Sequence, residues 1–485
     1  MGRLGRWRPV VVATVLATGV VGSSLAAALG DQGPPSVAES TPVTSCAPGS
    51  MPETTSVQGR VPSADFRSGR ALKGYTCNTR MVSRHGRTGG FKVLRYTDAA
   101  GHTCAYYDST LFLGKDVVTN LLNGTGLGVV VLDMSDPAHP RKTANLVSPA
   151  MLSPHESLLL NEPRGLLAGV MGTAATAPGI LDVYDVRTDC RHPRLLSSSP
   201  AGVLGHESGW SPDGMTFWAS GAAGFTMTAV DLSDPRRPRT IRTYPGVVSH
   251  GLRFSPDGRT MYVADMGTPS VHSILDNPGL RIYDVSQVQD RVGHPDIKLL
   301  SELHWDDASI PQVAQPFTSG GRDYVLEVDE FTDYFGDGLT KIFQKDAPVG
   351  AARIIDVDDP QHPFVVSDLR LQVHDQQYRT DDVLSDRGAR SPVQGYAAHY
   401  CSVPTQADPQ IAACSMIASG LRLFDISDVA HPKEVGYFNM PSNAGGWAMS
   451  QPAWDVGNHS VWYTDGNNGF FDVALDGDAR ALLDR

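Results

Sequence analysis

The fold of this chain is decided by the segment at residues 128–140, GVVVLDMSDPAHP, because the chain repeats it. The segment joins a short aliphatic run to an Asp, an Asp-Pro pair and a closing Pro. Longer copies follow at 181–193 (LDVYDVRTDCRHP), 227–238 (MTAVDLSDPRRP), 352–363 (ARIIDVDDPQHP) and 421–432 (LRLFDISDVAHP), with shorter ones at 280–286 and 470–476. A repeat must be recognised first, since it determines the architecture.

The Asp that ends each aliphatic run serves as a ruler along the chain. Consecutive markers lie 46 to 72 residues apart, and a four-stranded propeller blade takes about 40 to 50 residues. The seven markers are Asp133, Asp185, Asp231, Asp284, Asp356, Asp425 and Asp472. We therefore predict an all-β fold, a seven-bladed β-propeller of four-stranded blades, with eight blades as the alternative.

Local sequence also favours short strands joined by tight turns. Ser-Pro-Asp-Gly occurs at 211–214 and at 255–258, each time between two strand-like runs, and this order of residues suits a type I turn. The run FKVLRY at 91–96 reads as an N-terminal strand. We expect that strand to complete the last blade and close the ring, which removes exposed sheet edges.

The repeated strand resembles the LVIVD repeat family over roughly residues 89–485. The resemblance implies a β-propeller and does not specify an activity.

The N-terminus has the pattern of an export signal. Arg3, Arg6 and Arg8 precede an apolar run at 10–28, so residues 1–30 are predicted to be a Sec-type signal peptide, with an uncleaved membrane anchor as the alternative. Residues 31–61, rich in Ser, Pro and Thr, are predicted to be a disordered linker. The propeller domain then covers 62–485, and the protein is secreted or associated with the cell surface.

Net charge limits the classes of partner that the protein can bind, and cysteine content indicates the redox state of its compartment. The net charge of −12, without a basic cluster, argues against nucleic acid. Six cysteines in an exported chain indicate disulfides, and fifteen pairings are possible. Cys401 and Cys414 flank a short polar segment and are expected to pair first, and Cys77 with Cys104 is the second expectation. A closed ring needs no second subunit, so a monomer is expected.

Four histidines occupy matched positions at the start of four repeat units. They are His155, His206, His250 and His399. The first strand of each propeller blade lines the central channel, so four such imidazoles can meet on the axis. Imidazole suits Cu, Fe and Zn, and we predict a transition-metal site there. Glu156 and Glu207 follow two of the histidines and are candidates for orienting a neighbouring imidazole.

Other readings of these polar residues remain open. Each matched histidine could instead bond a backbone group at a strand start. His139, His192, His362 and His431 lie in the Asp-Pro tail of the repeat and are interpreted as turn residues. Asp329 and Glu330, with Asp333, form an acidic cluster on a predicted insertion, which reads as a solvated loop before a Ca²⁺ site.

The four-histidine arrangement is similar to that of the carotenoid cleavage oxygenases, and the copper-dependent methanethiol oxidases (selenium-binding proteins) are also propellers with a histidine-bound metal. The resemblance implies a metal and not a substrate. Two functions follow: an exported metal-dependent oxidoreductase acting on a small molecule, or a non-catalytic propeller whose loops bind an extracellular protein or glycan.

Overall fold

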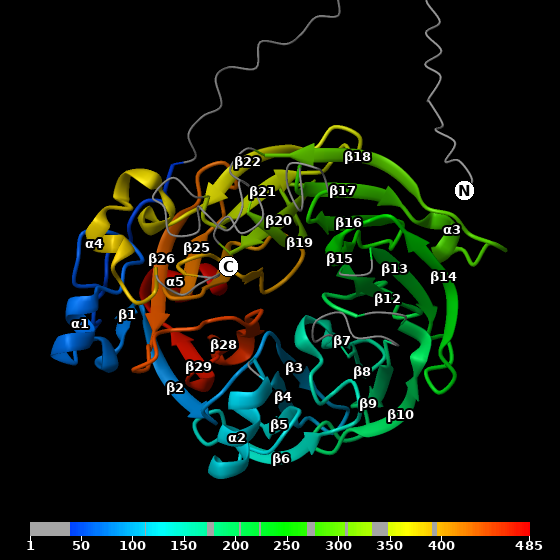
Figure 1. The fold of residues 1–485 in the computed structure, drawn as a ribbon, viewed down its shortest axis with the longest axis horizontal. Helices are drawn as coiled ribbons and strands as arrows, with labels where there is room; N and C mark the ends of the chain where they lie inside the picture. The colour runs from blue at the N-terminus through cyan, green and yellow to red at the C-terminus, as the bar shows by residue number, and fades with distance from the viewer. Residues whose placement is uncertain are drawn as a thin grey trace, which may run out of the picture. The chain divides into compact units, whose positions relative to one another are not determined.

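Seven antiparallel sheets stand side by side in a ring, and Figure 1 looks into that ring. The structure is a computed structural model that describes residues 39–111, 113–171, 179–202, 205–222, 225–268, 277–305, 309–331, 348–389 and 395–485. The predicted seven-bladed β-propeller of four-stranded blades is confirmed, and eight blades are excluded. The predicted signal peptide at 1–30 lies outside the described residues. None of the helices within them is long and apolar enough to span a membrane.

The first three blades each run in simple order from the inner to the outer strand. Blade 1 holds β3 (Val93–Thr97), β4 (Thr103–Asp108), β5 (Val129–Asp133) and β6 (Arg141–Leu146). Blade 2 holds β7 (Leu159–Asn161), β8 (Leu166–Val170), β9 (Leu181–Asp185) and β10 (Arg194–Ser199). Blade 3 holds β11 (Gly209–Trp210), β12 (Thr216–Gly221), β13 (Thr226–Asp231) and β14 (Arg239–Pro245).

The next two blades repeat this order, and the last two also take strands from the N-terminal region. Blade 4 holds β15 (Ser249–Phe254), β16 (Thr260–Asp265), β17 (Gly279–Asp284) and β18 (Lys298–His304). Blade 5 holds β19 (Ile310–Ser319), β20 (Arg322–Glu330), β21 (Ala352–Asp356) and β22 (Phe364–Leu369). Blade 6 holds β23 (Tyr400–Ser402), β24 (Ile411–Met416), β25 (Gly420–Asp425), β26 (Lys433–Asn439) and, outermost, β1 (Tyr75–Cys77). Blade 7 holds β27 (Ala453–Asp455), β28 (Ser460–Asp465), β29 (Gly469–Leu475) and β2 (Thr79–His85).

The helices of the described residues are short; α1 and η1 precede the first strand, α5 follows the last, and the others lie between strands. The α-helices are α1 (Ser63–Ser68), α2 (Leu113–Asn123), α3 (Ser286–Gln289), α4 (Asp381–Leu384) and α5 (Gly477–Leu483). Single 3₁₀ turns are η1 (Ala71–Lys73), η2 (His155–Ser157), η3 (Pro200–Gly202), η5 (Gln372–His374), η6 (Gln376–Tyr378) and η7 (Val456–Asn458). The core lies between the blades, where aliphatic side chains of one sheet pack on the next; Val131 of blade 1 and Leu167 of blade 2 belong to one such buried cluster.

The repeated strand is the third strand of each blade, and its Asp has a structural task. Asp133 ends β5 and accepts a hydrogen bond from the backbone N–H of Ser135 (3.0 Å). Asp425 does the same for Ser427 (2.9 Å), and the second Asp of the repeat, Asp428, accepts from Ala430 N (3.0 Å). These Asx turns lead the chain into the outermost strand. The degenerate seventh marker, Asp472, differs because it lies inside β29.

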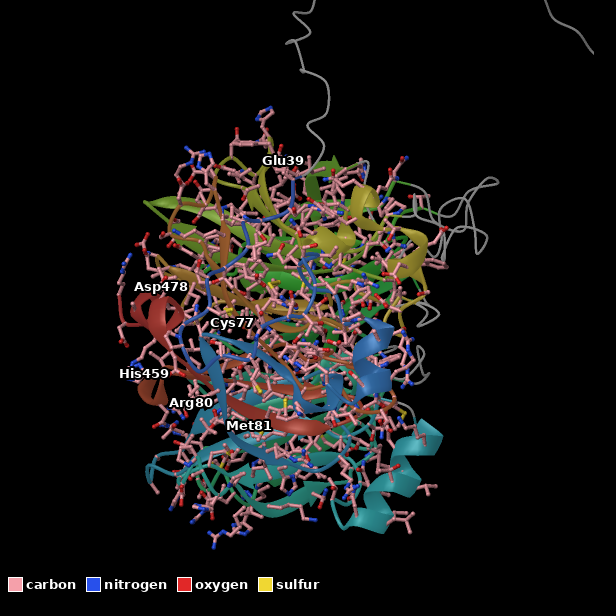
Figure 2. The ribbon with its side chains drawn as sticks, turned by 90° about the vertical axis from the view of Figure 1, so that its left-hand side faces the viewer. Glu39, Cys77, Arg80, Met81, His459 and Asp478 are labelled. Atoms are coloured by element: carbon pink, nitrogen blue, oxygen red, sulfur yellow. A yellow bond between two sulfur atoms is a disulfide. The ribbon has the colours of Figure 1, made fainter. Side chains whose placement is uncertain are left out.

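An N-terminal strand closes the ring, as predicted, but it is not the strand that the sequence analysis proposed. The run at 91–96 was expected to complete the last blade, but β3 pairs with β4 as the innermost strand of blade 1. The closing strand is β2, which pairs antiparallel with β29 from Thr79↔Leu475 to His85↔Phe470. Figure 2 shows β2, with Arg80 and Met81 labelled, running across the outside of this blade.

Three disulfides account for all six cysteines. The expected bond between Cys401 and Cys414 is present and joins directly paired residues of β23 and β24. The expected bond between Cys77 and Cys104 is wrong. Cys77 lies on β1 of blade 6 and bonds Cys46, whereas Cys104 of blade 1 bonds Cys190. Blade 7 separates the two cysteines, which the sequence order does not reveal.

Residues 39–61 are packed on blade 6, so the prediction of a disordered linker at 31–61 fails for this part, and 31–38 lie outside the described residues. The Cys46–Cys77 disulfide fixes the segment to β1. Gln58 donates to Glu434 (2.9 Å), and Glu53 forms an ion pair with the fully buried Arg422. Low hydrophobicity misled the prediction because these contacts are polar.

We expect Glu53→Ala to lower the free energy of unfolding by about 1–3 kcal/mol, because it removes one of the two carboxylates that Arg422 bonds inside the protein. Denaturant unfolding monitored by Trp fluorescence measures the change. Glu39→Ala, on the exposed start of the same segment, is the control and should be neutral. An unchanged Glu53→Ala protein would contradict a structural role for this segment.

Candidate functional site

The four matched histidines lie where four inner strands begin. His155 opens the 3₁₀ turn η2 before β7, and His206 lies in the loop before β11. His250 is the second residue of β15, and His399 immediately precedes β23. Blades 2, 3, 4 and 6 therefore each supply one imidazole to the same end of the central channel.

Glu156 stands at the centre of this group. Its Oε2 lies 3.1 Å from His206 Nε2, 3.3 Å from His250 Nε2 and 3.6 Å from His155 Nδ1. Its Oε1 lies 3.3 Å from His399 Nε2. The rings also approach one another directly, since the Nε2 atoms of His206 and His250 are 2.8 Å apart. One carboxylate thus touches all four imidazoles.

Glu330 completes the cluster, and Gln312 supports it from outside. Glu330, the last residue of β20, places Oε2 at 3.0 Å from His399 Nε2 and Oε1 at 3.5 Å from His250 Nε2. Gln312 of β19 donates from Nε2 to Glu156 Oε1 (2.6 Å) and orients that carboxylate. We call the six residues His155, Glu156, His206, His250, Glu330 and His399 the axial cluster.

Backbone carbonyls fix how two imidazoles face the cluster. His250 Nδ1 donates to the carbonyl of Pro311 (2.9 Å), and His399 Nδ1 donates to that of Met449 (2.6 Å). With Nδ1 occupied in this way, Nε2 of each ring points at the carboxylates. Metal-binding histidines are commonly oriented like this, by a hydrogen bond from the other ring nitrogen to a carbonyl or carboxylate. Glu156 Oε2 and His399 Nε2 are buried and have no hydrogen-bond partner of acceptable geometry among the described residues.

Electrostatics inside the axial cluster favour positive charge near the two carboxylates. Burial alone raises the pKa of Glu156, but His206 and His155 outweigh it and hold that pKa well below its usual value. Burial lowers the pKa of His399, yet Glu156 and Glu330 raise it to about 9, and the same balance raises the pKa of His250. The cluster attracts a cation, whether a proton or a metal ion.

The cluster opens to solvent on one side only. The side chains of His155 and His206 are 20% and 19% exposed, whereas those of His250 and His399 are 2% and 0% exposed. The aromatic ring of Phe91 stacks on His155 with ring centroids 4.0 Å apart, and it also packs against His399 with centroids 5.4 Å apart. His155 has φ 53°, a left-handed backbone unusual for a non-glycine residue; such strain often accompanies function.

Glu207 lies below the cluster and does not orient a histidine, contrary to the sequence-based interpretation. Its carboxylate bonds Lys92 Nζ (2.9 Å), Arg253 Nη2 (2.6 Å) and the Tyr400 hydroxyl (2.6 Å). Glu207 lies in the loop between His206 and β11, and these three contacts occupy its carboxylate. This layer of buried charges fills the channel beneath the cluster.

Sequence reasoning missed Glu330, Gln312 and Lys92. Asp329 and Glu330 were interpreted as a solvated loop, but both are buried at the end of β20, where Asp329 bonds Arg353 (3.0 Å). Their place at the end of a strand-like run, which became the second strand of blade 5, was the available signal. Gln312 escaped notice because aligning the repeat units matches Gln315, not Gln312, to the histidine position in blade 5. Lys92 lies in the strand-like run whose blade was misassigned.

A cavity of about 410 Å³ lies farther along the inner strands, beyond the layer around Glu207. Arg95, Glu162, Gln315, Gln451 and Trp454 are among its lining residues. The inner strands run from the axial cluster toward this cavity, so the two occupy opposite ends of the channel.

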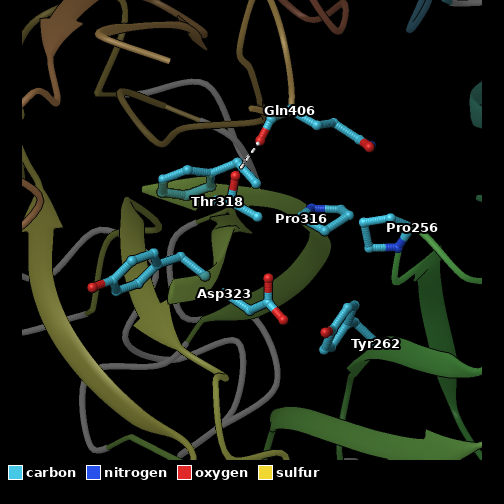
Figure 3. Close-up of a pocket in the computed structure, with 8 residues that line it drawn as sticks. Pro256, Tyr262, Pro316, Thr318, Asp323 and Gln406 are labelled. Carbon is cyan, nitrogen blue, oxygen red and sulfur yellow. Dashed lines mark hydrogen bonds between the residues drawn. The ribbon is translucent and has the colours of Figure 1, made fainter. Parts of the chain in front are cut away.

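A second hollow, shown in Figure 3 between Tyr262, Pro316 and Asp323, has a volume of about 10 Å³. That volume is close to the minimum for a single water molecule.

A separate group of Asp98, His102 and Asp189 also lies within metal-binding distance. Asp98 is already satisfied, because Oδ2 accepts from Cys190 N (3.0 Å) and bonds His102 Nδ1 (3.0 Å). Asp189 likewise bonds Arg191 and His192. These contacts support the neighbouring turn beside the Cys104–Cys190 disulfide, and we assign the group a structural role.

Comparison with known proteins identifies the fold and no family. No family model matches the chain, and no curated protein matches it. Hydrazine synthase from Kuenenia stuttgartiensis is similar with a TM-score of 0.50 at 11% identity, over 82% of this chain and 98% of that chain. The periplasmic gluconolactonase of Pseudomonas aeruginosa gives a TM-score of 0.44 at 12% identity, over 71% and 85%. The molecule is thus a seven-bladed β-propeller with a buried histidine–glutamate cluster, and no family model supports the resemblance to the LVIVD repeat family.

The buried Lys92 gives a pH-dependent prediction. Burial lowers the pKa of Lys92 from 10.5 to about 8. Between these values the unfolded chain binds the proton that the folded chain has lost, so this group makes stability rise with pH, by about 3 kcal/mol in total. We expect Lys92→Met to lose that rise in unfolding experiments from about pH 7.5 to about pH 10. The exposed Lys73→Met should keep it, and an unchanged slope in Lys92→Met would refute the assignment.

Proposed function

We propose that the axial cluster binds a transition-metal ion, Cu, Fe or Zn, through His155, His206, His250 and His399. In this proposal the protein is an exported metalloprotein, and the metal serves an oxidoreductase reaction on a small molecule that approaches past His155 and His206. The three disulfides support an oxidising compartment such as the cell exterior.

The observation that carries the proposal is the spacing of the donor atoms. Metal–ligand bonds of about 2.0–2.1 Å place neighbouring ligand atoms about 2.9–3.4 Å apart in octahedral or tetrahedral coordination. Glu156 Oε2 lies 3.1 Å from His206 Nε2 and 3.3 Å from His250 Nε2, and Glu330 Oε2 lies 3.0 Å from His399 Nε2. The cluster therefore has the dimensions of a coordination shell.

The chemistry of the donors supports the same conclusion. Imidazole and carboxylate together suit Fe, Cu and Zn, whereas the soft ligands that select Cu(I) are sulfur atoms, and the cysteines are all disulfide-bonded. The competing arrangement balances Glu156 and Glu330 with protons on His250 and His399 and needs no metal. Metal analysis distinguishes the two.

The test is metal content of the exported form after purification and after incubation with Cu, Fe and Zn salts. We expect at least one tightly bound ion per chain, and about a 10-fold or greater loss of affinity in His206→Ala, since removing outer-shell partners alone already costs about 10- to 100-fold. His431→Ala is the matched control, because His431 is an exposed turn residue bonded to Asp428. A folded wild-type protein that retains none of these metals would refute the proposal.

A second candidate function is favoured by the 410 Å³ cavity. Its size falls in the range of small-molecule sites, and Trp454, Arg95 and Glu162 offer an aromatic surface and both charges. A non-catalytic propeller that binds a glycan or an extracellular protein would use this end of the channel. Glycan-array binding that is lost in Trp454→Ala, with the metal content unchanged, would support it; binding that is unaffected by Trp454→Ala would exclude this cavity.

A further inference from the structure

We infer that the axial cluster holds two metal ions bridged by the carboxylate of Glu156. This inference rests on the proposed metal function and specifies its form: an outer ion bound by His155, His206 and Glu156, and an inner ion bound by His250, His399, Glu330 and Glu156.

The donor atoms divide into two groups that share a single residue. His155, Glu156 and His206 form one group in which all ligand atoms lie within 4.8 Å of one another, and Glu156, Glu330 and His399 form another. His250 Nε2 lies between the groups, 2.8 Å from His206 Nε2 and 3.3 Å from the shared Glu156 Oε2. We assign it to the second group because it also lies 3.5 Å from Glu330 Oε1. Six side chains exceed what a single four-coordinate ion requires.

Glu156 presents Oε2 to both outer histidines and Oε1 to His399 of the inner group. Oε2 is the oxygen next to His206 and His155, and it also lies 3.3 Å from His250 Nε2, whereas Oε1 is the oxygen next to His399. Each carboxylate oxygen carries two lone pairs, so Oε1 can accept from Gln312 and still bind an ion. A carboxylate that presents one oxygen to each ion suits metals about 3.5–4 Å apart, the separation found in two-metal sites.

The two positions differ in burial and in completeness. The inner group has four ligands, all 5% exposed or less, and this is the closed coordination typical of a structural ion. The outer group has three ligands, two of them about one-fifth exposed, and three protein ligands with an open position are typical of a reactive ion. The outer set of two histidines and one carboxylate is the donor set that non-haem Fe(II) takes.

The decisive experiment is a titration of the metal-free full-length exported protein with Mn(II), Fe(II) or Zn(II), followed by metal analysis and, for Mn(II), electron paramagnetic resonance. We expect two ions per chain and a spin-coupled Mn(II) spectrum. One ion per chain would overturn this inference and leave the proposed function standing. No bound ion would overturn both.

Variants assign the two positions separately. His155→Ala removes a partly exposed ligand, and we expect it to retain one ion and to lose the spin coupling. Glu330→Gln should also retain one ion, now at the outer position, and the circular dichroism spectrum of each variant checks the fold. His192→Ala, an exposed turn histidine bonded to Asp189, should retain two coupled ions. Two coupled ions in His155→Ala would overturn the assignment of the outer position.

Discussion

Closure of the ring by the pairing of β2 with β29 is the constraint on which the rest of the structure depends. The last blade lacks its outer strand until residues 79–85 supply it, and only a closed ring holds seven inner strands at fixed angles about one axis. The four histidines come from blades 2, 3, 4 and 6. They lie far apart in the sequence, and only the arrangement of the blades brings them together. An open arc of blades would leave the same residues apart.

Buried charge along the axis is arranged in two layers. The axial cluster contains the carboxylates of Glu156 and Glu330, and the layer beneath it pairs Glu207 with Lys92 and Arg253. In the lower layer, the cationic side chains of Lys92 and Arg253 neutralise the carboxylate of Glu207. The upper layer has only imidazoles, which are neutral unless protonated. This asymmetry explains why the upper layer, and not the lower, requires a mobile positive charge.

The repeat allowed the architecture and the histidine ring to be predicted, because a period in sequence becomes rotation about an axis in a propeller. His155, His206, His250 and His399 were found in this way. Features that break the period were not found. Gln312 lies three residues before the matched position, Gln315. Glu330 ends a second strand instead of beginning a first, and β2 belongs to a blade at the other end of the chain. The same limit explains the failed Cys77–Cys104 pairing, since disulfide partners follow the final ring order.

The position of β2 also determines the order in which the molecule can be completed. Its partner strand β29 follows all the other blades in the sequence, so β2 stays unpaired until β29 has been synthesised. Such long-range pairing forms slowly, and β29 meanwhile presents an open edge to other chains. Folding is therefore limited by the meeting of β2 and β29, and dilution or a chaperone that shields the last blade would raise the yield of folded protein.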